Sequence, residues 1–124
     1  MFQSHNTIVV GVGLKSESLL EIKENLLELE ELVTAAGGII VGSLTQILNQ
    51  WNPATLIGSG KVLEIKEMVQ DSGAEYVVID HLISGVQARN LETAIGVKVL
   101  DRNQIILDIF SQRAQTFEGK LQVE

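Results

Sequence analysis

Hydrophobic residues along this chain alternate between short unbroken runs and longer stretches with helical spacing. Residues 7–11 form a β-branched run that closes with glycine, which is typical of a buried strand. The next stretch predicts an amphipathic helix, because its apolar positions recur at steps of three and four residues: Leu19, Ile22, Leu26, Leu29 and Val33. Ser18 and Glu21 have the spacing of a capping box at the start of this helix, and Gly37 followed by Gly38 marks its end.

The same alternation continues through the middle of the chain. Residues 39–41 begin a second strand that can extend toward residue 47. Residues 49–57 contain Trp51 and the single proline among several polar residues, so we expect a loop there. A second helix opens at residues 58–60 and ends at Gly73, and its inward positions are Val62, Ile65, Met68 and Val69.

Two more pairs of strand and helix complete the order. Residues 76–80 and 97–100 are predicted as buried strands. Ser84 is the candidate N-cap of a third helix that ends at Gly96, with Val86, Leu91, Ala94 and Ile95 facing inward. Asp101 is the candidate N-cap of a fourth helix, with Ile105, Ile106, Ile109 and Phe110 facing inward.

Four strands that alternate with four helices predict an α/β fold. We expect a four-stranded parallel sheet with helices on both faces, (βα)4, although the pattern leaves the strand order open. Residues 1–115 form this α/β subdomain in our interpretation. Thr116 can cap a further helix that carries Phe117 and Leu121, so we expect residues 116–124 to start a helical subdomain.

Composition narrows the class of protein. Hydrophobic residues make up 45% of the chain and aromatic residues 4%, which predicts a folded domain with an aliphatic core. The absence of cysteine and the presence of only two histidines argue against disulfides and against a metal site. No apolar run approaches the roughly 20 residues of a membrane helix, and the N-terminus lacks a signal-peptide pattern, so we expect a cytoplasmic protein.

The formal net charge of −7 is distributed unevenly. Residues 1–97 carry five Lys and Arg against twelve Asp and Glu, whereas residues 98–124 carry four of each class. An acidic body does not attract nucleic acid through its overall field, so any contact with RNA has to be local.

Gly58, Ser59, Gly60 and Lys61 invite comparison with the phosphate-binding loop of nucleotide hydrolases. The match fails, because Thr55 stands where that motif has its first glycine and because Val62 replaces the Ser or Thr that holds magnesium. Two interpretations remain open. Ser59 caps the second helix, or the glycine-rich turn at the start of that helix contacts a phosphate.

Other catalytic motifs also fail. Gly11 and Gly13 lack the third glycine of a dinucleotide fingerprint, because position 16 is Ser16. Asp80 ends a predicted strand, as the phosphoacceptor of a receiver domain does, but the acidic pair that such a domain needs after its first strand is missing. We therefore interpret Asp80 as a turn or cap residue. His81 has no evident Ser or Cys partner, so we predict no catalytic residues in this chain.

The candidates for contact with RNA are basic residues, because arginine suits bidentate contact with phosphate. They are Arg89, Arg102, Arg113 and Lys120, with Lys61 as an additional candidate. The alternative is that these side chains form surface salt bridges with the acidic residues nearest in sequence, which are Asp101, Asp108, Glu92 and Glu118.

Several stretches together carry a specific resemblance. They are PATLIGSGKV at 53–62, QARNLE at 87–92, VLDR at 99–102, ILDIF at 106–110, QRA at 112–114, Thr116, and EGKLQVE at 118–124. Their order and spacing closely resemble the N-terminal region of the HflX family of translational GTPases, over nearly the whole chain.

The resemblance implies a four-stranded parallel subdomain, then a long two-helix hairpin that begins near residue 118, then a GTPase domain that these 124 residues lack. It also implies binding to the large ribosomal subunit and the splitting or rescue of stalled ribosomes, with GTP and Mg²⁺ held by the absent domain. We therefore expect a ribosome-engaging, non-catalytic domain of a GTPase. The alternatives are a small nucleotide-binding enzyme or sensor, and a regulatory domain that packs on the GTPase domain.

Overall fold

The computed structural model describes the backbone of residues 5–123 and the side chains of residues 5–114. Its elements alternate as the sequence predicts. The strands are β1 (Asn6–Leu14), β2 (Ile39–Leu48), β3 (Tyr76–Asp80) and β4 (Lys98–Asp101), and the helices are α1 (Leu19–Ala35), α2 (Ser59–Ser72), α3 (Gly85–Ile95) and α4 (Arg102–Val123).

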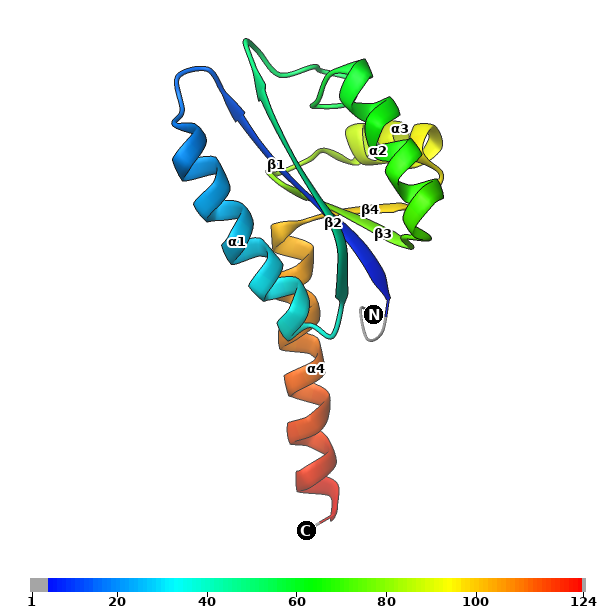
Figure 1. Ribbon diagram of the computed structural model, residues 1–124. Helices are drawn as coiled ribbons and strands as arrows, with labels where there is room; N and C mark the ends of the chain where they lie inside the picture. Colours follow the sequence, from blue (N-terminus) through cyan, green and yellow to red (C-terminus); the bar gives the residue numbers. More distant parts are fainter. Residues whose placement is uncertain (1–4, 124) are drawn as a thin grey trace.

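The four strands form one parallel sheet in the order β2-β1-β3-β4. This order, which the sequence leaves open, places the long strands β1 and β2 side by side and makes β2 and β4 the two edges. The register between β1 and β2 shifts between Thr7 and Ile8, which is a β-bulge in β2. Figure 1 shows the sheet between two layers of helices, with α1 and α4 on one face and α2 and α3 on the other.

The core is aliphatic, as predicted, and has two halves. Every buried hydrophobic side chain in the described part of the chain is Ile, Leu, Val or Ala. Alternate residues of β1 serve the two halves, since Ile8 and Val10 pack with α2 and α3 whereas Val9 packs with α1 and α4. A fully buried parallel strand needs apolar residues on both faces, and this explains the unbroken β-branched run in β1.

The helix ends follow local chemistry, with one correction. Ser18 caps α1 by accepting a hydrogen bond from the Leu20 N–H, but the predicted capping box with Glu21 does not form. The complete box occurs at α3, where Ser84 and Gln87 exchange hydrogen bonds. Gly37 has φ of 98°, and its backbone permits the left-handed turn that ends α1.

Some predicted inward positions are wrong. Leu19, Val86 and Phe110 are 44%, 55% and 62% exposed, and Ala94 is also exposed. Val86 and Phe110 each lie five positions from a fully buried residue of the same helix, Leu91 and Ile105, which places them about 140° around the helix axis. A residue that far from the centre of the buried stripe faces solvent.

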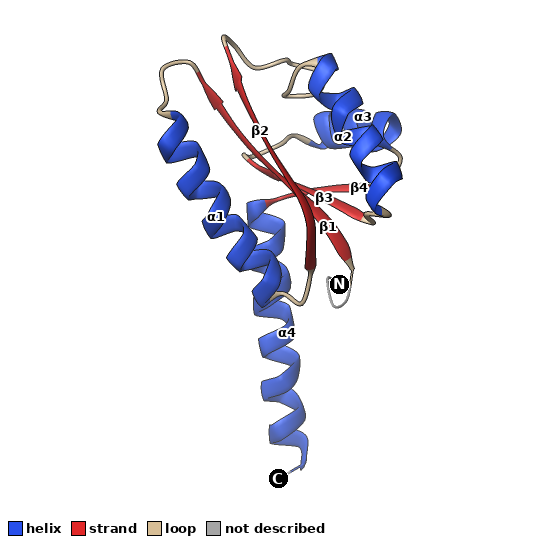
Figure 2. Ribbon diagram, in the orientation of Figure 1, coloured by secondary structure: helices blue, strands red, loops and turns tan. Residues whose placement is uncertain are grey.

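The fourth helix is longer than predicted. Helix α4 runs without interruption from Arg102 to Val123, so the expected new helix at Thr116 is wrong. Figure 2 shows α4 continuing well past the sheet. The predicted apolar side of residues 116–124, with Phe117 and Leu121, lies outside the described side chains. Within the described residues, no helix has both the length and the apolar character required to cross a membrane.

Candidate functional site at the carboxyl edge of the sheet

The carboxyl ends of all four strands lie along one edge of the sheet, because the strands are parallel. From β1 the chain first passes to β2, on one side of β1. It then crosses back to β3, which lies on the other side of β1. Open α/β sheets bind their ligands at such a reversal. In this domain the reversal lies between the ends of β1 and β3, next to Leu14 and Asp80.

An ion pair between Asp80 and Arg102 lies at this reversal. The Nε of Arg102 donates a hydrogen bond of 2.9 Å to Asp80 Oδ1, and its Nη2 donates one of 2.8 Å to the carbonyl oxygen of Asn25. Its Nη1 lies 3.6 Å from Glu28 Oε2. A single guanidinium therefore ties the first residue of α4 to the end of β3 and to α1.

These contacts correct two interpretations of the sequence. Asp80 is the partner of a partly buried ion pair and not a turn or cap residue. Arg102 pairs with Asp80 and Glu28, and not with the acidic residues near it in sequence. Asp101 does cap α4, as predicted, because its carboxylate accepts the Gln104 N–H at 3.0 Å while Gln104 Oε1 accepts the Asp101 N–H at 3.0 Å.

Burial and charge act on Asp80 in opposite directions. Burial is the larger effect and raises the pKa of the Asp80 carboxyl above its ordinary value of 3.8. The adjacent guanidinium of Arg102 lowers that pKa, but it offsets the burial only in part, and Glu28 adds to the increase.

A polar cavity of about 210 Å³ opens beside the ion pair. Its walls come from β1, α1, the end of β3 and the start of α4, and they consist of Val12, Glu17, Glu21, Ile22, Asn25, Asp80, His81 and Arg102. Three carboxyl groups face one guanidinium in this lining. The excess of acidic groups opposes the binding of a triphosphate at the place where a doubly wound sheet would otherwise hold one.

The two glycines in the second half of β1, Gly11 and Gly13, have a packing role. A side chain at Gly13 would collide with Ile22 and with the Glu17 carboxylate, and that carboxylate accepts the Leu14 N–H at 2.7 Å. Gly11 likewise faces Ile22 and Leu26 of α1. The two glycines therefore allow α1 to lie close to β1, which agrees with the rejection of a dinucleotide fingerprint.

Helix α2 begins without a side-chain cap. Its N-cap residue is Gly58 and not Ser59, so the predicted capping by Ser59 is wrong. The Gly58 N–H donates to Gln46 Oε1 at 3.1 Å, and Ser59 and Gly60 are exposed. Lys61 forms an ion pair with Glu64 at 2.8 Å. The first turn of α2 therefore presents backbone N–H groups to the surface without a side chain of its own to satisfy them.

The loop before α2 is fixed by α3. Asn90 Nδ2 donates to the Ala54 carbonyl at 2.9 Å, and Gln87 Nε2 lies 3.4 Å from the carbonyls of Asn52 and Pro53. Trp51 lies against the ring of His81, with 4.4 Å between the ring centroids. We call residues 49–61 together with Gln87, Arg89 and Asn90 the loop–α3 surface.

The structure separates the basic candidates. Arg89 is exposed on α3 and Lys61 lies at the start of α2, so both belong to the loop–α3 surface. Arg102 is engaged in the ion pair. Arg113 is exposed on α4, roughly 16 Å along the helix axis from Arg102 at 1.5 Å per residue. The side chain of Lys120 lies outside the described residues.

The structure also bears on metal binding and on the role of His81. Within residues 5–114 no three His, Asp or Glu side chains are arranged to hold a metal ion. The Nδ1 of His81 lies 2.9 Å from the Leu82 carbonyl oxygen, and its ring packs on Trp51, so its contacts belong to packing.

The comparisons with known proteins identify the family. A family model described as GTP-binding GTPase N-terminal matches residues 23–111. Proteins named GTPase HflX are 46% identical over 104 residues in Caldanaerobacter subterraneus subsp. tengcongensis and 46% identical over 101 residues in Escherichia coli K12. The chain belongs to the HflX family and corresponds to an N-terminal domain of it. It spans about a quarter of the relatives' length, since the two alignments cover 84% and 82% of this chain but 24% of each relative.

Solved structures share the fold of this HflX domain. A crystal structure of SsGBP in complex with GDP has a TM-score of 0.62 and 20% sequence identity, and the match covers 86% of this chain and 29% of that one. A variant of the same protein, G235P, has a TM-score of 0.62, covering 86% of this chain and 32% of that one at 21% identity. At this level of identity the similarity establishes the architecture alone.

Two of the stretches that carry the HflX resemblance come together in space, whereas those after residue 102 lie on α4, on the other face of the sheet. Residues 53–62 and 87–92 meet in the loop–α3 surface through the bonds from Gln87 and Asn90. Residues 99–102 end at the Asp80–Arg102 ion pair, which shares the carboxyl edge of the sheet with this surface. The sequence did not reveal the roles of Asn25, Gln46 and Asn90, because single polar residues on helices and strands give no periodic signal.

The loop at residues 55–62 does not have the features of a triphosphate-binding loop. Besides the absence of the first glycine and of the magnesium-binding hydroxyl, the Gly58 N–H is already bonded to Gln46, and Leu56 adopts a φ of 66° in the middle of the loop. A triphosphate cradle requires a run of free backbone N–H groups around the phosphates. This HflX domain supplies one free helix start in place of such a loop.

Proposed function

We propose that this chain is the ribosome-engaging N-terminal domain of a cytoplasmic HflX-type GTP-binding protein. In this proposal the parent protein associates with the large ribosomal subunit and helps to split or rescue stalled ribosomes. GTP and Mg²⁺ are bound by a GTPase domain outside these residues, and the present domain binds and positions without catalysing. The observation that carries the proposal is the contact between two of the HflX-like stretches, residues 53–62 and 87–92, in the loop–α3 surface.

The chemistry of the loop–α3 surface suits contact with ribosomal RNA. Arg89 offers an exposed guanidinium on α3, and the uncapped start of α2, where backbone N–H groups and the helix dipole favour an anion, belongs to the same surface by definition. Gln87 and Asn90 fix the loop beside it, so little order has to be gained on binding. A local basic site of this kind is what an acidic domain needs if it is to meet a phosphate backbone.

The other basic candidates take different roles in the proposal. Arg102 acts as a positioning residue, because three of its donors already point to Asp80, Asn25 and Glu28. Arg113 and Lys120 remain candidates for a second RNA contact along α4, which extends beyond the sheet. Two separate contact zones would fix the orientation of the domain on RNA better than one zone alone.

The direct test is co-sedimentation of the 124-residue chain with purified large ribosomal subunits. We expect Arg89→Glu to reduce the bound fraction, because it reverses a charge that faces phosphate. Lys23→Glu is the matched control, since Lys23 is exposed on α1, on the opposite face of the sheet. Equal binding by the wild type and by both variants would show that the loop–α3 surface does not contact the large ribosomal subunit.

A second function is favoured by the anchoring of α4. The ion pair between Asp80 and Arg102 joins α4 to β3 and α1, so a shift of the sheet would move the helix that leaves the domain. In this reading the domain regulates a GTPase domain through α4. Arg102→Ala in a full-length HflX protein that contains this domain should then change the rate of GTP hydrolysis while leaving ribosome binding intact.

The nucleotide-binding alternative has the opposite expectation. The carboxylates that line the cavity at the reversal oppose a triphosphate, so we expect no heat of binding when ATP or GTP is titrated into this chain. Binding with micromolar affinity would revive that alternative and count against a domain that only binds and positions.

A further inference from the structure

The outer edge of β2 is open along the longest strand of the sheet. β2 pairs with β1 on one side only, and its Ile39 and Ile47 are 49% and 38% exposed. A strand edge of ten residues presents a row of backbone N–H and C=O groups that another strand can pair with. The strand continues at its carboxyl end into the loop–α3 surface, but its open edge faces outward from the sheet.

A shallow apolar groove runs beside this edge on the α1 face. It has a volume of about 670 Å³ and is lined by Leu27, Glu30, Glu31, Thr34, Ala35 and Ile40. Leu27 is 61% exposed, so its side chain offers apolar surface to a molecule that enters the groove. The rim of the groove carries the carboxylates of Glu30 and Glu31.

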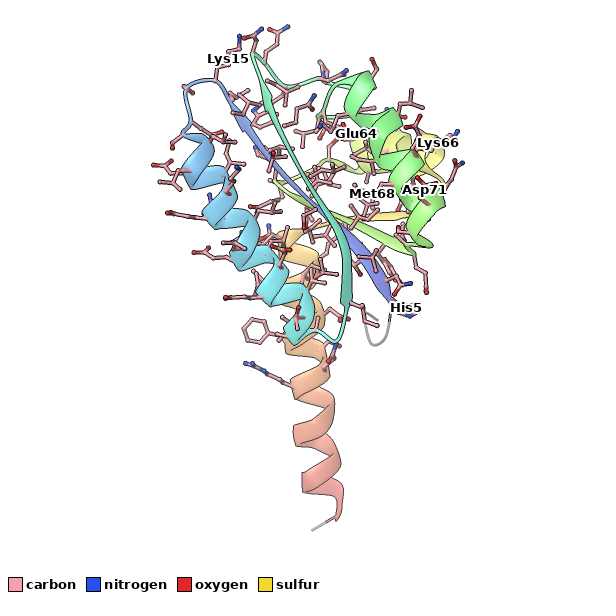
Figure 3. All side chains as sticks on the ribbon, viewed as in Figure 1. His5, Lys15, Glu64, Lys66, Met68 and Asp71 are labelled. Carbon is pink, nitrogen blue, oxygen red and sulfur yellow. The ribbon has the colours of Figure 1, made fainter. Side chains whose placement is uncertain are left out.

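A second groove lies on α2, the helix that covers β2 on the other face of the sheet. It has a volume of about 330 Å³ and is lined by Glu64, Glu67, Met68, Asp71 and Ser72 of α2. Met68, which is labelled in Figure 3, places this groove near β2, because its sulfur occupies the space next to Gly42 of that strand. The buried hydroxyl of Ser72 has no hydrogen-bond partner among the described residues, so this groove also offers an unused polar atom.

The charges of the two grooves select the occupant. Five of their lining residues are acidic, and within the described part of the chain neither lining includes a Lys, Arg or His. An added strand places successive side chains on opposite faces of the sheet. Its apolar side chains would therefore enter the α1 groove beside Leu27 and Ile40, and its alternate basic side chains would meet Glu67 and Asp71 in the α2 groove.

We propose that the β2 edge is a docking site for an extended protein segment in which apolar and basic residues alternate. The segment adds to the sheet as a fifth strand, so that backbone hydrogen bonds supply affinity and the two grooves supply specificity. The partner is a basic protein with an exposed strand or tail. This site does not depend on the proposed contact of the loop–α3 surface with RNA.

The same charges disfavour two other occupants. A phosphate backbone would face the carboxylates of both grooves, which is repulsive. A second copy of the chain that paired through β2 would bring the acidic rims of two molecules together, and like charges that lie opposite each other are destabilising.

The test uses the 124-residue chain and a synthetic peptide of about six residues with alternating Val and Lys, a typical strand length. Binding is followed by the backbone amide signals in NMR and by fluorescence anisotropy of the labelled peptide. We expect shift changes concentrated in residues 39–48. We also expect no binding by a peptide with Glu in place of Lys, or by one whose alternate amides are N-methylated and cannot pair.

Two pairs of matched variants test the grooves. Glu67→Lys should weaken binding about fivefold, because it replaces an attractive charge with a repulsive one, whereas Glu24→Lys, on α1 outside the grooves, should not. Leu27→Asn should weaken binding about threefold through the lost apolar contact, whereas Leu20→Asn on the same helix should not. Leu20 is 66% exposed and Leu27 is 61% exposed, so both changes leave the core intact.

Several results would overturn the proposal. An N-methylated peptide that binds as well as the unmodified one would exclude strand addition. Equal losses from Glu24→Lys and Glu67→Lys would reduce the binding to general attraction by an acidic surface. Displacement of the peptide by oligouridylate, or a concentration-dependent dimer that blocks the peptide, would assign the edge to RNA or to a second copy.

Discussion

The Asp80 carboxylate is held where burial disfavours its charge and a neighbouring guanidinium favours it. Its side chain is 12% exposed, and that of Arg102 is 29% exposed. The effect of burial on the Asp80 pKa is larger than the effect of the Arg102 charge. The loss of one partner therefore has a different effect on stability from the loss of the other. Removal of the arginine leaves a buried negative charge, whereas neutralisation of the aspartate leaves a cation that still has Glu28 and the Asn25 carbonyl beside it.

We first predict that the loss of Arg102 destabilises the domain more than the neutralisation of Asp80. Arg102→Ala should lower the free energy of unfolding by about 2 kcal/mol, because it leaves Asp80 without its partner. Asp80→Asn should stay within about 1 kcal/mol of the wild type, because the amide keeps the shape and removes the costly charge. Urea unfolding followed by circular dichroism measures both values, and a larger loss from Asp80→Asn would contradict this description of the ion pair.

The second prediction concerns pH. Since the pKa of Asp80 is higher in the folded chain than its ordinary value of 3.8, the folded chain holds this proton more tightly than the unfolded chain. The contribution of this residue to stability is then fully present below pH 3.8 and is lost as the pH rises through the raised pKa.

The test compares the wild type with Asp80→Asn at a series of pH values. The wild type should lose stability relative to the variant as the pH rises from below the ordinary pKa of aspartate. The subtraction cancels the groups that both proteins share. A gain by the wild type over that range would mean that the Arg102 charge outweighs the burial of Asp80.

Among the elements, the loop before α2 is held in its conformation by side chains of α3. Residues 49–57 contain no long regular element, and yet Asn90 and Gln87 of α3 bind three of their carbonyl oxygens. Leu56 is buried with a φ of 66°, a conformation that the surrounding contacts have to maintain. The shape of the loop therefore depends on α3.

The third prediction uses the only tryptophan as a reporter of this loop. Asn90→Ala removes the 2.9 Å bond to the Ala54 carbonyl, so Trp51 should become more accessible to acrylamide and its emission should move to longer wavelength. Glu92→Ala is not a suitable control, because Glu92 binds the Val99 N–H, whereas Thr93→Ala changes an exposed position on the same helix. Identical quenching in Asn90→Ala and Thr93→Ala would show that the loop holds its shape without α3.

The elements themselves could be predicted because their signals are local. The run in β1, the stripe Ile22, Leu26, Leu29 and Val33, and the glycines that end three helices all appear in the structure. The burial of residues at the margins of helices could not be predicted. Whether Val86 and Phe110 are buried depends on which part of each helix meets the sheet. The continuity of α4 past Thr116 was also hidden, since a possible capping residue inside a helix resembles one at its start.

The site was harder to predict than the fold, because its contacts join distant parts of the chain. Arg102 bonds to residues that precede it by 22 and 77 positions, and no spacing rule in the sequence connects them. The HflX resemblance did point to the segments that converge on the loop–α3 surface. It could not say that Arg102 is engaged inside the domain while Arg89 is exposed.

On the scale of the whole molecule, the domain has two surfaces of opposite character. The loop–α3 surface offers Arg89 and a free helix start, whereas the β2 edge is bordered by carboxylates. Helix α4 leaves the sheet from a third position (Figure 1). This division suits a platform that contacts RNA through one side, a basic protein through another and a GTPase domain through α4.

We propose above that the loop–α3 surface contacts phosphate on the large ribosomal subunit. The most direct test is the dependence of the affinity for large subunits on salt concentration, compared between the wild type and Arg89→Glu. We expect the slope of log K against log salt to fall by about one for the variant, with lower affinity at every salt concentration. An unchanged slope and affinity, with the same values for Lys23→Glu, would contradict the claim.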